Sequence, residues 1–233
     1  MKRLLEIILV GGLLLIASGS ILAQDNGVKK KLEKLPLKEF SSSGKGNSFI
    51  LLLTGDGGWR DLTNSIGTYF SKRNMPVIGI NSRSYFWSEK KRQQVAGDLT
   101  AIIHHYSEKW QRKNVIIIGY SFGADVLPLV FNALPADIKN MTKHLVLIAP
   151  GQHANFIIKL MEYFSSDDDG IPILPELEKI TKVPVYIICD DDRHALCHVL
   201  SDSWDYQMVE GGHHFNDQYD KINGLIEKKI IGH

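Results

Sequence analysis

Short apolar runs alternate along this chain with longer stretches whose apolar residues recur every three or four positions. The short runs have the length and the β-branched content of buried strands, and they lie at residues 48–53, 76–80, 115–118, 143–148, 183–188 and 206–209. The longer stretches have the spacing of amphipathic helices, and they lie at residues 62–73, 93–110, 124–134 and 216–231. Strands that alternate with helices predict an α/β fold, with a mostly parallel sheet and helices on both of its faces.

Two stretches do not follow this alternation. Residues 24–47 are mostly polar, and we interpret them as a lead-in segment with room for one edge strand. Residues 150–182 contain an apolar run followed by a polar turn with three aspartates at residues 167–169. The turn lacks the ordered ligand series of a calcium loop, so we interpret it as solvated. This second stretch is the one place with room for a lid, which would be small.

The first 23 residues have the pattern of a secretory signal peptide. Lys2 and Arg3 precede an apolar segment at residues 7–16 that is too short to span a bilayer comfortably, and Ala23 ends an Ile-Leu-Ala tripeptide before polar residues. An uncleaved membrane anchor is the alternative interpretation. We therefore expect an exported protein with a single domain over residues 48–233.

Composition and cysteine content limit the possible binding partners and indicate a disulfide. The 27 basic and 26 acidic residues nearly balance, and no basic run suggests binding to nucleic acid. Cys189 and Cys197 form an even pair, which in an oxidising compartment is a candidate disulfide; two free thiols are the alternative.

Candidate chemistry begins at the strand over residues 115–118. This strand leads directly into Gly-Tyr-Ser-Phe-Gly at residues 119–123, a match to G-x-S-x-G, and a predicted helix follows. In this context the motif is typical of a nucleophile elbow, in which a strained turn holds the serine hydroxyl above the sheet. Ser121 is therefore the candidate nucleophile. A buried serine in a glycine-bounded turn is the alternative.

A serine nucleophile needs a general base and a carboxylate that orients the base. In α/β-hydrolases these follow the serine in the order acid, then histidine. Here a strand leads into three aspartates at residues 190–192, and the last strand leads into Gly-Gly-His-His at residues 211–214. Both sets follow the C-terminal ends of strands, where open α/β sheets place their sites.

The choice within each set rests on position. The acid usually lies a few residues past its strand, which favours Asp192 over Asp191, and the base usually follows a glycine, which favours His213 over His214. A metal site that combines the aspartates with His194 and His198 is the alternative, but the residues lack a known ligand spacing. We predict neither a metal nor a cofactor.

The tetrahedral intermediate of acyl transfer needs two N–H donors for its oxyanion. The first candidate is the N–H of Phe122, which follows the nucleophile. The second is the N–H of Asp56, in the glycine-rich loop at residues 54–58. Tyr85 and Trp87 lie in an aromatic segment and are candidates to contact a substrate or lipid, although packing in the core is the alternative for at least one ring.

Four motifs, in order, resemble the bacterial virulence protein VirJ and the VirJ domain of AcvB. They are Gly-Asp-Gly-Gly-Trp at residues 55–59, Tyr-Phe-Trp at 85–87, Gly-Tyr-Ser-Phe-Gly-Ala-Asp-Val-Leu-Pro at 119–128 and Gly-Gly-His-His-Phe at 211–215. The resemblance implies an α/β-hydrolase fold and export to the periplasm. It also implies hydrolysis of lysyl-phosphatidylglycerol, as associated with AcvB-type members, or a role in type IV secretion, as associated with VirJ.

The chain departs from this family at the acid loop. Ile188 and Cys189 replace a Tyr-Gly pair, and His194 stands where relatives often have an acid. The resemblance therefore leaves Asp191 or Asp192 as the acid.

Two functional hypotheses follow. In the first, the protein is an exported serine esterase that acts on an aminoacylated phospholipid or another ester, with transient contact to a membrane surface. In the second, the same scaffold serves as a non-catalytic binding protein or secretion accessory with a secretion-system partner.

Overall fold

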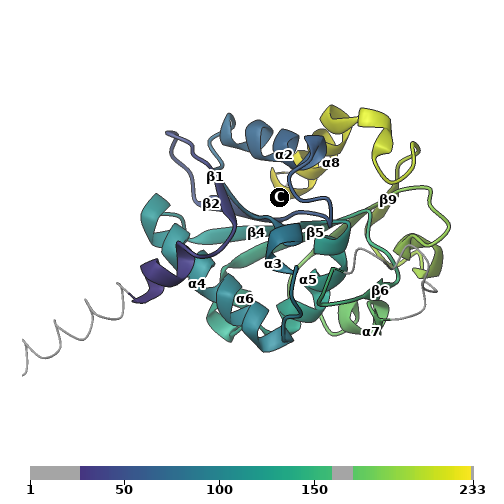
Figure 1. Cartoon of the computed structure of the whole chain (residues 1–233). Coiled ribbons are helices and arrows are strands. Elements are labelled where there is room, and N and C mark those ends of the chain that lie inside the picture. The colour runs from purple at the N-terminus through teal and green to yellow at the C-terminus, as the bar shows by residue number, and fades with distance from the viewer. Residues whose placement is uncertain (1–26, 159–169, 232–233) are drawn as a thin grey trace, which may run out of the picture. The chain divides into compact units, whose positions relative to one another are not determined.

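Among the residues that the computed structural model describes, seven strands form one sheet (Figure 1). In spatial order they are β1 (Leu37–Phe40), β3 (Val77–Ile80), β2 (Ser48–Leu53), β4 (Asn114–Tyr120), β5 (Thr142–Ile148), β8 (Val185–Cys189) and β9 (Tyr206–Met208). β1 runs antiparallel to β3, and every other pairing in this sheet is parallel. The predicted mostly parallel sheet is confirmed, and the lead-in segment supplies its one antiparallel edge strand.

Helices cover both faces of the sheet (Figure 1). One face packs against α2 (Asp61–Ser71) and α8 (Tyr219–Ile231), and the core between them includes Ile50 and Ile118 from the sheet and Phe70 from α2. The other face is covered by α4 (Arg92–Trp110) and α5 (Phe122–Ala133). The central strands are therefore buried on both sides, which explains why their sequences are continuously apolar rather than alternating.

The structure describes residues 27–158 and 170–231. Residues 36–233 form one unit, and residues 1–35 form another, of which residues 27–32 are helical. The predicted signal peptide and the acidic turn at residues 167–169 lie outside the described residues. No helix in the described ranges is long and apolar enough to cross a membrane.

Short elements fill the stretches where the sequence pattern is weak. α3 (Ser82–Tyr85) replaces the loop expected after β3, α6 (Ala136–Met141) precedes β5, and α7 (Leu174–Leu177) precedes β8. Two-residue strands, β6 (His153–Ala154) and β7 (Ile171–Pro172), pair in a separate antiparallel sheet. The 3-10 helices η2 (Leu196–Val199) and η3 (Phe215–Asp217) follow β8 and β9.

The helix after the nucleophile motif begins earlier than the pattern predicts. α5 starts at Phe122 rather than at residue 124, and Pro128 falls in its second turn. Pro128 is fully buried among apolar neighbours of the helix. A proline there removes the hydrogen bond that the carbonyl of Ala124 would otherwise receive within the helix.

Candidate active site

Ser121 lies at the turn between β4 and α5 with a backbone conformation that non-glycine residues rarely adopt, φ 51° and ψ −123°. The flanking glycines allow this turn. A Cβ on Gly119 would lie 2.5 Å from the carbonyl oxygen of Gly123, and a Cβ on Gly123 would lie 2.5 Å from the carbonyl oxygen of Leu53. Strain of this kind costs on the order of 1–3 kcal/mol and persists at functional sites. The turn has the geometry expected of a nucleophile elbow.

A continuous hydrogen-bonded series connects Ser121 to a buried carboxylate. The Nε2 atom of His213 lies 2.8 Å from the Oγ of Ser121, and its Nδ1 lies 2.7 Å from Oδ2 of Asp190. A carboxylate accepts only, so Nδ1 carries the proton and donates to Asp190, and Nε2 is left to accept from the serine hydroxyl. The hydrogen bond to Asp190 raises the pKa of His213, and burial partly opposes this.

The prediction that Asp192 orients the base is wrong. β8 extends to Cys189, one residue beyond the predicted strand, so Asp190 is the first residue after it and is only 2 % exposed. Its side chain therefore faces the histidine across the edge of the sheet. The carboxylate of Asp192 instead accepts from the backbone N–H of His194 at 2.9 Å.

The other aspartate of this loop connects it to the histidine loop. Oδ1 of Asp191 accepts from the backbone N–H of Gly212 at 2.6 Å, and this bond lowers the pKa of Asp191. Gly212, at φ +64°, directly precedes His213. Two neighbouring carboxylates thus position the histidine: Asp190 bonds its ring, and Asp191 bonds the backbone of the preceding Gly212.

A disulfide closes the loop that carries these acids. Cys189 and Cys197 are bonded, as the even cysteine pair predicts. The bond joins the last residue of β8 to η2 and therefore brackets residues 190–196. Asp190 directly follows the bridged Cys189, so the bridge restrains the backbone that positions the carboxylate.

Tyr120 explains which of the two adjacent histidines meets the serine. Its hydroxyl donates to the carbonyl oxygen of His213 at 3.0 Å and lies 3.0 Å from Nδ1 of His214. Its ring stacks on that of His213, with centroids 5.8 Å apart. Burial raises the pKa of Tyr120, so its hydroxyl stays protonated. His214 is held by Tyr120, and the structure brings His213 rather than His214 to Ser121.

The glycine-rich loop after β2 lies against the nucleophile. A Cβ on Gly55 would lie 3.2 Å from the Cβ of Ser121, and Gly58 donates to the carbonyl of Gly55 at 3.0 Å to close a tight turn around Asp56. Phe122 is the first residue of α5, so its N–H has no acceptor within the helix. Both candidate oxyanion donors therefore belong to backbone adjacent to Ser121.

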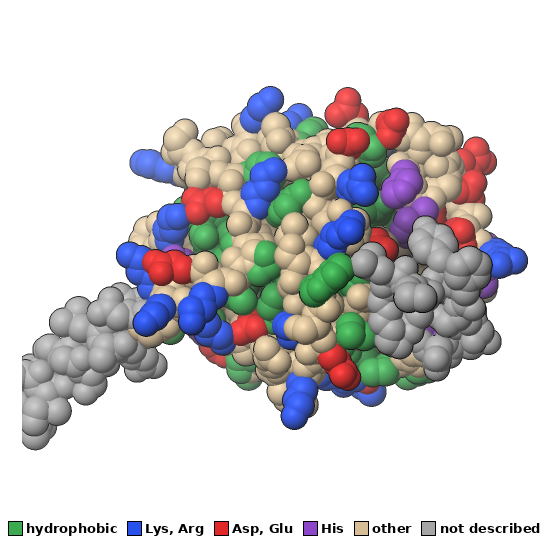
Figure 2. All heavy atoms as spheres, in the orientation of Figure 1, with side chains coloured by type: hydrophobic (Ala, Val, Ile, Leu, Met, Phe, Trp, Pro, Cys, Tyr) green, Lys and Arg blue, Asp and Glu red, His purple; other side chains and the backbone are tan. Residues whose placement is uncertain are grey.

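A pocket of about 500 Å³ opens beside Ser121 and His213. On the face of the molecule drawn in Figure 2, histidine side chains lie near Lys or Arg side chains. The sequence gives no signal for several of the residues that line it, because they come from four separate segments. These residues are Arg60, Asp61, Leu62, Arg83, Ile158, Asp217 and Tyr219.

The sequence profile described as bacterial virulence protein (VirJ) matches residues 47–231, which is most of the chain. The chain belongs to the VirJ family. No curated protein sequence matches it.

Solved structures with the same fold include an enzyme with bound ferulic acid and an alpha-beta serine hydrolase homologue. Est1E from Butyrivibrio proteoclasticus with bound ferulic acid superposes with a TM-score of 0.58 at 11% identity, over 85% of this chain and 94% of that one. MenH from S. aureus gives 0.60 at 14% identity, over 84% and 98%. An alpha-beta serine hydrolase homologue from Coxiella burnetii gives 0.53 at 14% identity, over 83% and 90%. At these identities the likeness establishes the α/β-hydrolase fold of this VirJ-family chain.

In the aromatic segment of this VirJ-family protein, the alternative of core packing holds for Tyr85. Tyr85 is only 5% exposed, and its hydroxyl donates to the carboxylate of Asp98 in α4. Phe86 packs between Tyr85 and Phe122 in the core. The prediction that Tyr85 binds substrate is therefore wrong. Trp87 is 57% exposed, but it does not line the pocket beside Ser121.

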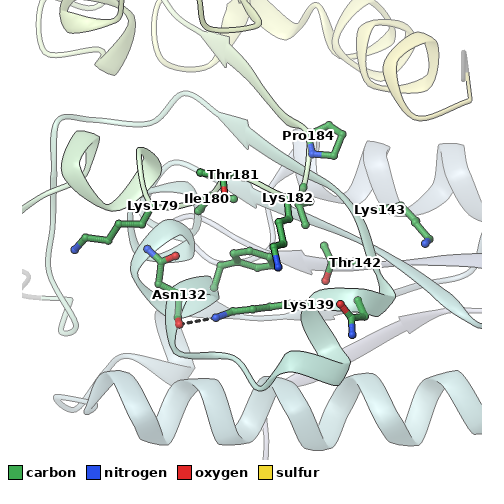
Figure 3. A pocket seen from close by; sticks show the side chains of 12 residues that line it. Asn132, Lys139, Thr142, Lys143, Lys179, Ile180, Thr181, Lys182 and Pro184 are labelled. Carbon is green, nitrogen blue, oxygen red and sulfur yellow. Dashed lines mark hydrogen bonds between the residues drawn. The ribbon is translucent and has the colours of Figure 1, made fainter.

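A second pocket of about 480 Å³ lies at the opposite edge of the sheet, where β5 and β8 begin (Figure 3). Lys139 and Lys182 extend across it, whereas Lys143 and Lys179 point away from its centre. It shares no residue with the pocket beside Ser121. The candidate active site is therefore the pocket at the C-terminal edge of the sheet, where Ser121, His213 and Asp190 converge.

Proposed function

We propose that this VirJ-family protein is a serine esterase. The observation that carries the proposal is the hydrogen-bonded series from the Oγ of Ser121 through His213 to Asp190, with bonds of 2.8 and 2.7 Å. A binding protein has no need for a strained serine, a histidine in one defined tautomer and a buried acid arranged in this order.

The series performs acyl transfer in two steps. Nε2 of His213 takes the proton from Ser121 while Oγ attacks the carbonyl carbon of the ester, and the tetrahedral intermediate then collapses. The departing alcohol takes the proton from Nε2, which leaves an acyl group on Oγ. Water then attacks the acyl carbon and gives its proton to Nε2; the bond between Oγ and the acyl carbon breaks, Oγ takes that proton back, and the acid is released. Asp190 stabilises the imidazolium that forms in each step.

The N–H groups of Phe122 and Asp56 are the donors for the oxyanion. Removal of one such donor typically costs about 100-fold to 1000-fold in kcat, so the loop at residues 54–58 is as important to the proposal as the histidine. Gly55 lets this loop approach Ser121 closely.

For the substrate we propose an aminoacyl ester of phosphatidylglycerol, such as lysyl-phosphatidylglycerol. The family resemblance supports this choice, and so does the charge of the pocket. An aminoacyl ester has an ammonium group next to its scissile carbonyl, and Asp56 and Asp61 line the pocket with exposed carboxylates. Such a substrate requires transient contact with a membrane surface.

We propose that the protein acts in the periplasm. The N-terminal signal-peptide pattern supports export. The Cys189–Cys197 disulfide supports an oxidising compartment as the site of action, because structural disulfides are rare in the cytosol.

The test is release of lysine from lysyl-phosphatidylglycerol in detergent micelles by residues 24–233. The wild type should release lysine, and Ser121→Ala should not. Ser203→Ala, which removes an exposed hydroxyl in the loop before β9, should match the wild type. Equal lysine release by wild type and Ser121→Ala would contradict the serine mechanism. No release, together with no reaction of Ser121 with a fluorophosphonate, would favour a binding role in secretion instead.

A further inference from the structure

Two arginines line the active-site pocket. Arg60 is the N-cap of α2, Arg83 lies in α3, and both line the pocket beside Ser121. Within the described part of the chain, neither side chain forms a hydrogen bond or an ion pair. Other arginines do: Arg73 pairs with Glu227 at 3.1 Å, and Arg92 pairs with Glu176 at 3.5 Å.

Arg60 is held next to the loop that carries a proposed oxyanion donor. A Cβ on Gly57 would lie 3.1 Å from its Nε and 3.4 Å from its Cγ, so Gly57 leaves the space through which the side chain passes. The same loop contacts Ser121 through Gly55. A substrate whose anionic group is bound by Arg60 would therefore place its neighbouring atoms close to Ser121.

The pocket also contains carboxylates, and these do not neutralise the arginines directly. Asp217 accepts from the hydroxyl of Tyr219, and the negative charge of Asp56 contributes to the raised pKa of His213. Among the described residues, no salt bridge joins Asp56, Asp61 or Asp217 to Arg60 or Arg83. The pocket therefore presents separate charges of both signs, which suits a ligand that carries both.

We propose that Arg60 and Arg83 form a subsite for a phosphate group in the alcohol part of the substrate, while Asp56 faces an ammonium group in its acyl part. The guanidinium fork matches the oxygens of a phosphate in a bidentate manner, and two forks from different segments fix the group in position. The substrate class is then an amino-acid ester of a phosphate-bearing alcohol. This inference rests on the proposed esterase function, because it assumes that the scissile ester lies between the two charges.

The subsite can be tested first without turnover. Binding of glycerol 3-phosphate, glycerate and glycerol to the Ser121→Ala protein is measured by NMR titration at low salt. Glycerol 3-phosphate should bind at least about tenfold more tightly than glycerol and more tightly than glycerate, and Arg60→Gln or Arg83→Gln should each weaken it about tenfold. Lys143→Gln removes a positive charge at the opposite edge of the sheet and should leave the affinity unchanged. Equal affinity for glycerol and its phosphate would overturn the proposal, and a preference for glycerate would overturn the choice of phosphate.

Turnover then tests whether the subsite selects substrates. Lysyl esters of glycerol and of glycerol 3-phosphate differ by one phosphate group. The wild type should favour the phosphate ester through a lower KM. Arg60→Gln and Arg83→Gln should reduce the ratio of the two kcat/KM values about tenfold, and Arg83→Lys should restore part of it. If both variants lowered kcat/KM equally for the two esters, the arginines would have a structural role instead.

A third substrate separates failure of the subsite from failure of the proposed function. Cleavage of 4-nitrophenyl butyrate that depends on Ser121 reports the esterase alone. If this ester is cleaved but the two lysyl esters are not distinguished, the esterase function stands and the subsite is wrong. If no ester is cleaved, the esterase function is wrong, and the glycerol 3-phosphate titration still decides whether the arginines bind phosphate.

Discussion

Replacing Asp190 by asparagine is the sharpest single perturbation of the proposed mechanism. Asp190 is only 2% exposed and lies 2.7 Å from Nδ1 of His213. Asparagine has almost the same shape, so the fold is preserved. Its amide can, however, donate to Nδ1, which favours the tautomer whose proton is on Nε2. That tautomer cannot accept the proton of Ser121.

The expected loss is about 10⁴-fold in kcat, equivalent to about 5.5 kcal/mol of transition-state stabilisation. The pH profile should change as well. The base works only when neutral, so activity falls as pH drops through the pKa of His213, which the hydrogen bond to Asp190 raises. Without that bond, burial lowers the pKa, and the acidic limb of residual activity should move to lower pH.

The assay is kcat/KM for 4-nitrophenyl butyrate between pH 5 and 9. Asp192→Asn is the matched control, because it makes the same chemical change two residues away, where the carboxylate contacts the backbone of His194. We expect that control to stay within about threefold of the wild type. An Asp192→Asn variant that loses more activity than Asp190→Asn would refute the assignment of the acid and return it to the residue that the sequence favoured.

Further predictions concern the parts that support the site. Reduction of the Cys189–Cys197 disulfide, which spans a sequence separation of 8, should lower the free energy of unfolding by about 2.5 kcal/mol in urea titrations and also reduce kcat; an unchanged midpoint would contradict this. Burial raises the pKa of Asp125 to about 7, so the folded state binds more protons than the unfolded chain above about pH 4. The stability of the wild type should therefore fall relative to Asp125→Asn as pH rises from about 4 to about 7, and a pH-independent difference would refute it. Gly55→Ala places a Cβ 3.2 Å from the Cβ of the nucleophile and should lower kcat at least about tenfold with little loss of stability, whereas Gly97→Ala, with nothing within 4 Å, should leave kcat unchanged.

The sheet was predictable because its strands are buried on both faces. In a strand such as β4, residues 115–120 are all buried, and the apolar run at residues 115–118 indicates this without knowledge of the neighbouring strands. The edge strand β1 has a weaker pattern, since its residues are only partly buried. The turn that carries Ser121 was also predictable, because a glycine-bounded serine between a strand and a helix is a local signal.

The acid was not predictable to the residue. Three consecutive aspartates at residues 190–192 follow β8, and the choice among them depends on where the strand ends. β8 continues through Cys189, which pairs with β9 and is bonded to Cys197. A shift of one residue turns a different side chain toward the histidine, and no local pattern encodes that shift.

The pocket lining could not be derived from the sequence either. Arg60 and Arg83 are separated by more than twenty positions, and both line one pocket because β2 and β3 are adjacent parallel strands with their C-terminal ends at one edge. Tyr85, in contrast, was assigned to the site from the sequence although it lies in the core. An aromatic side chain near a site can bind ligand or fill the core, and its hydrogen bond to Asp98 shows that it belongs to the core.

The central claim is that Ser121 is a nucleophile activated by His213. The most direct measurement is the intact mass of the protein after reaction with a fluorophosphonate, followed by peptide mapping of the modified residue. We predict one phosphonyl group on Ser121, no addition in Ser121→Ala, and strongly slowed addition in His213→Gln, whereas His104→Gln, which removes a histidine paired with Asp137, should react like the wild type. A wild-type protein that stays unmodified, or one that is modified equally fast in His213→Gln, would contradict the account.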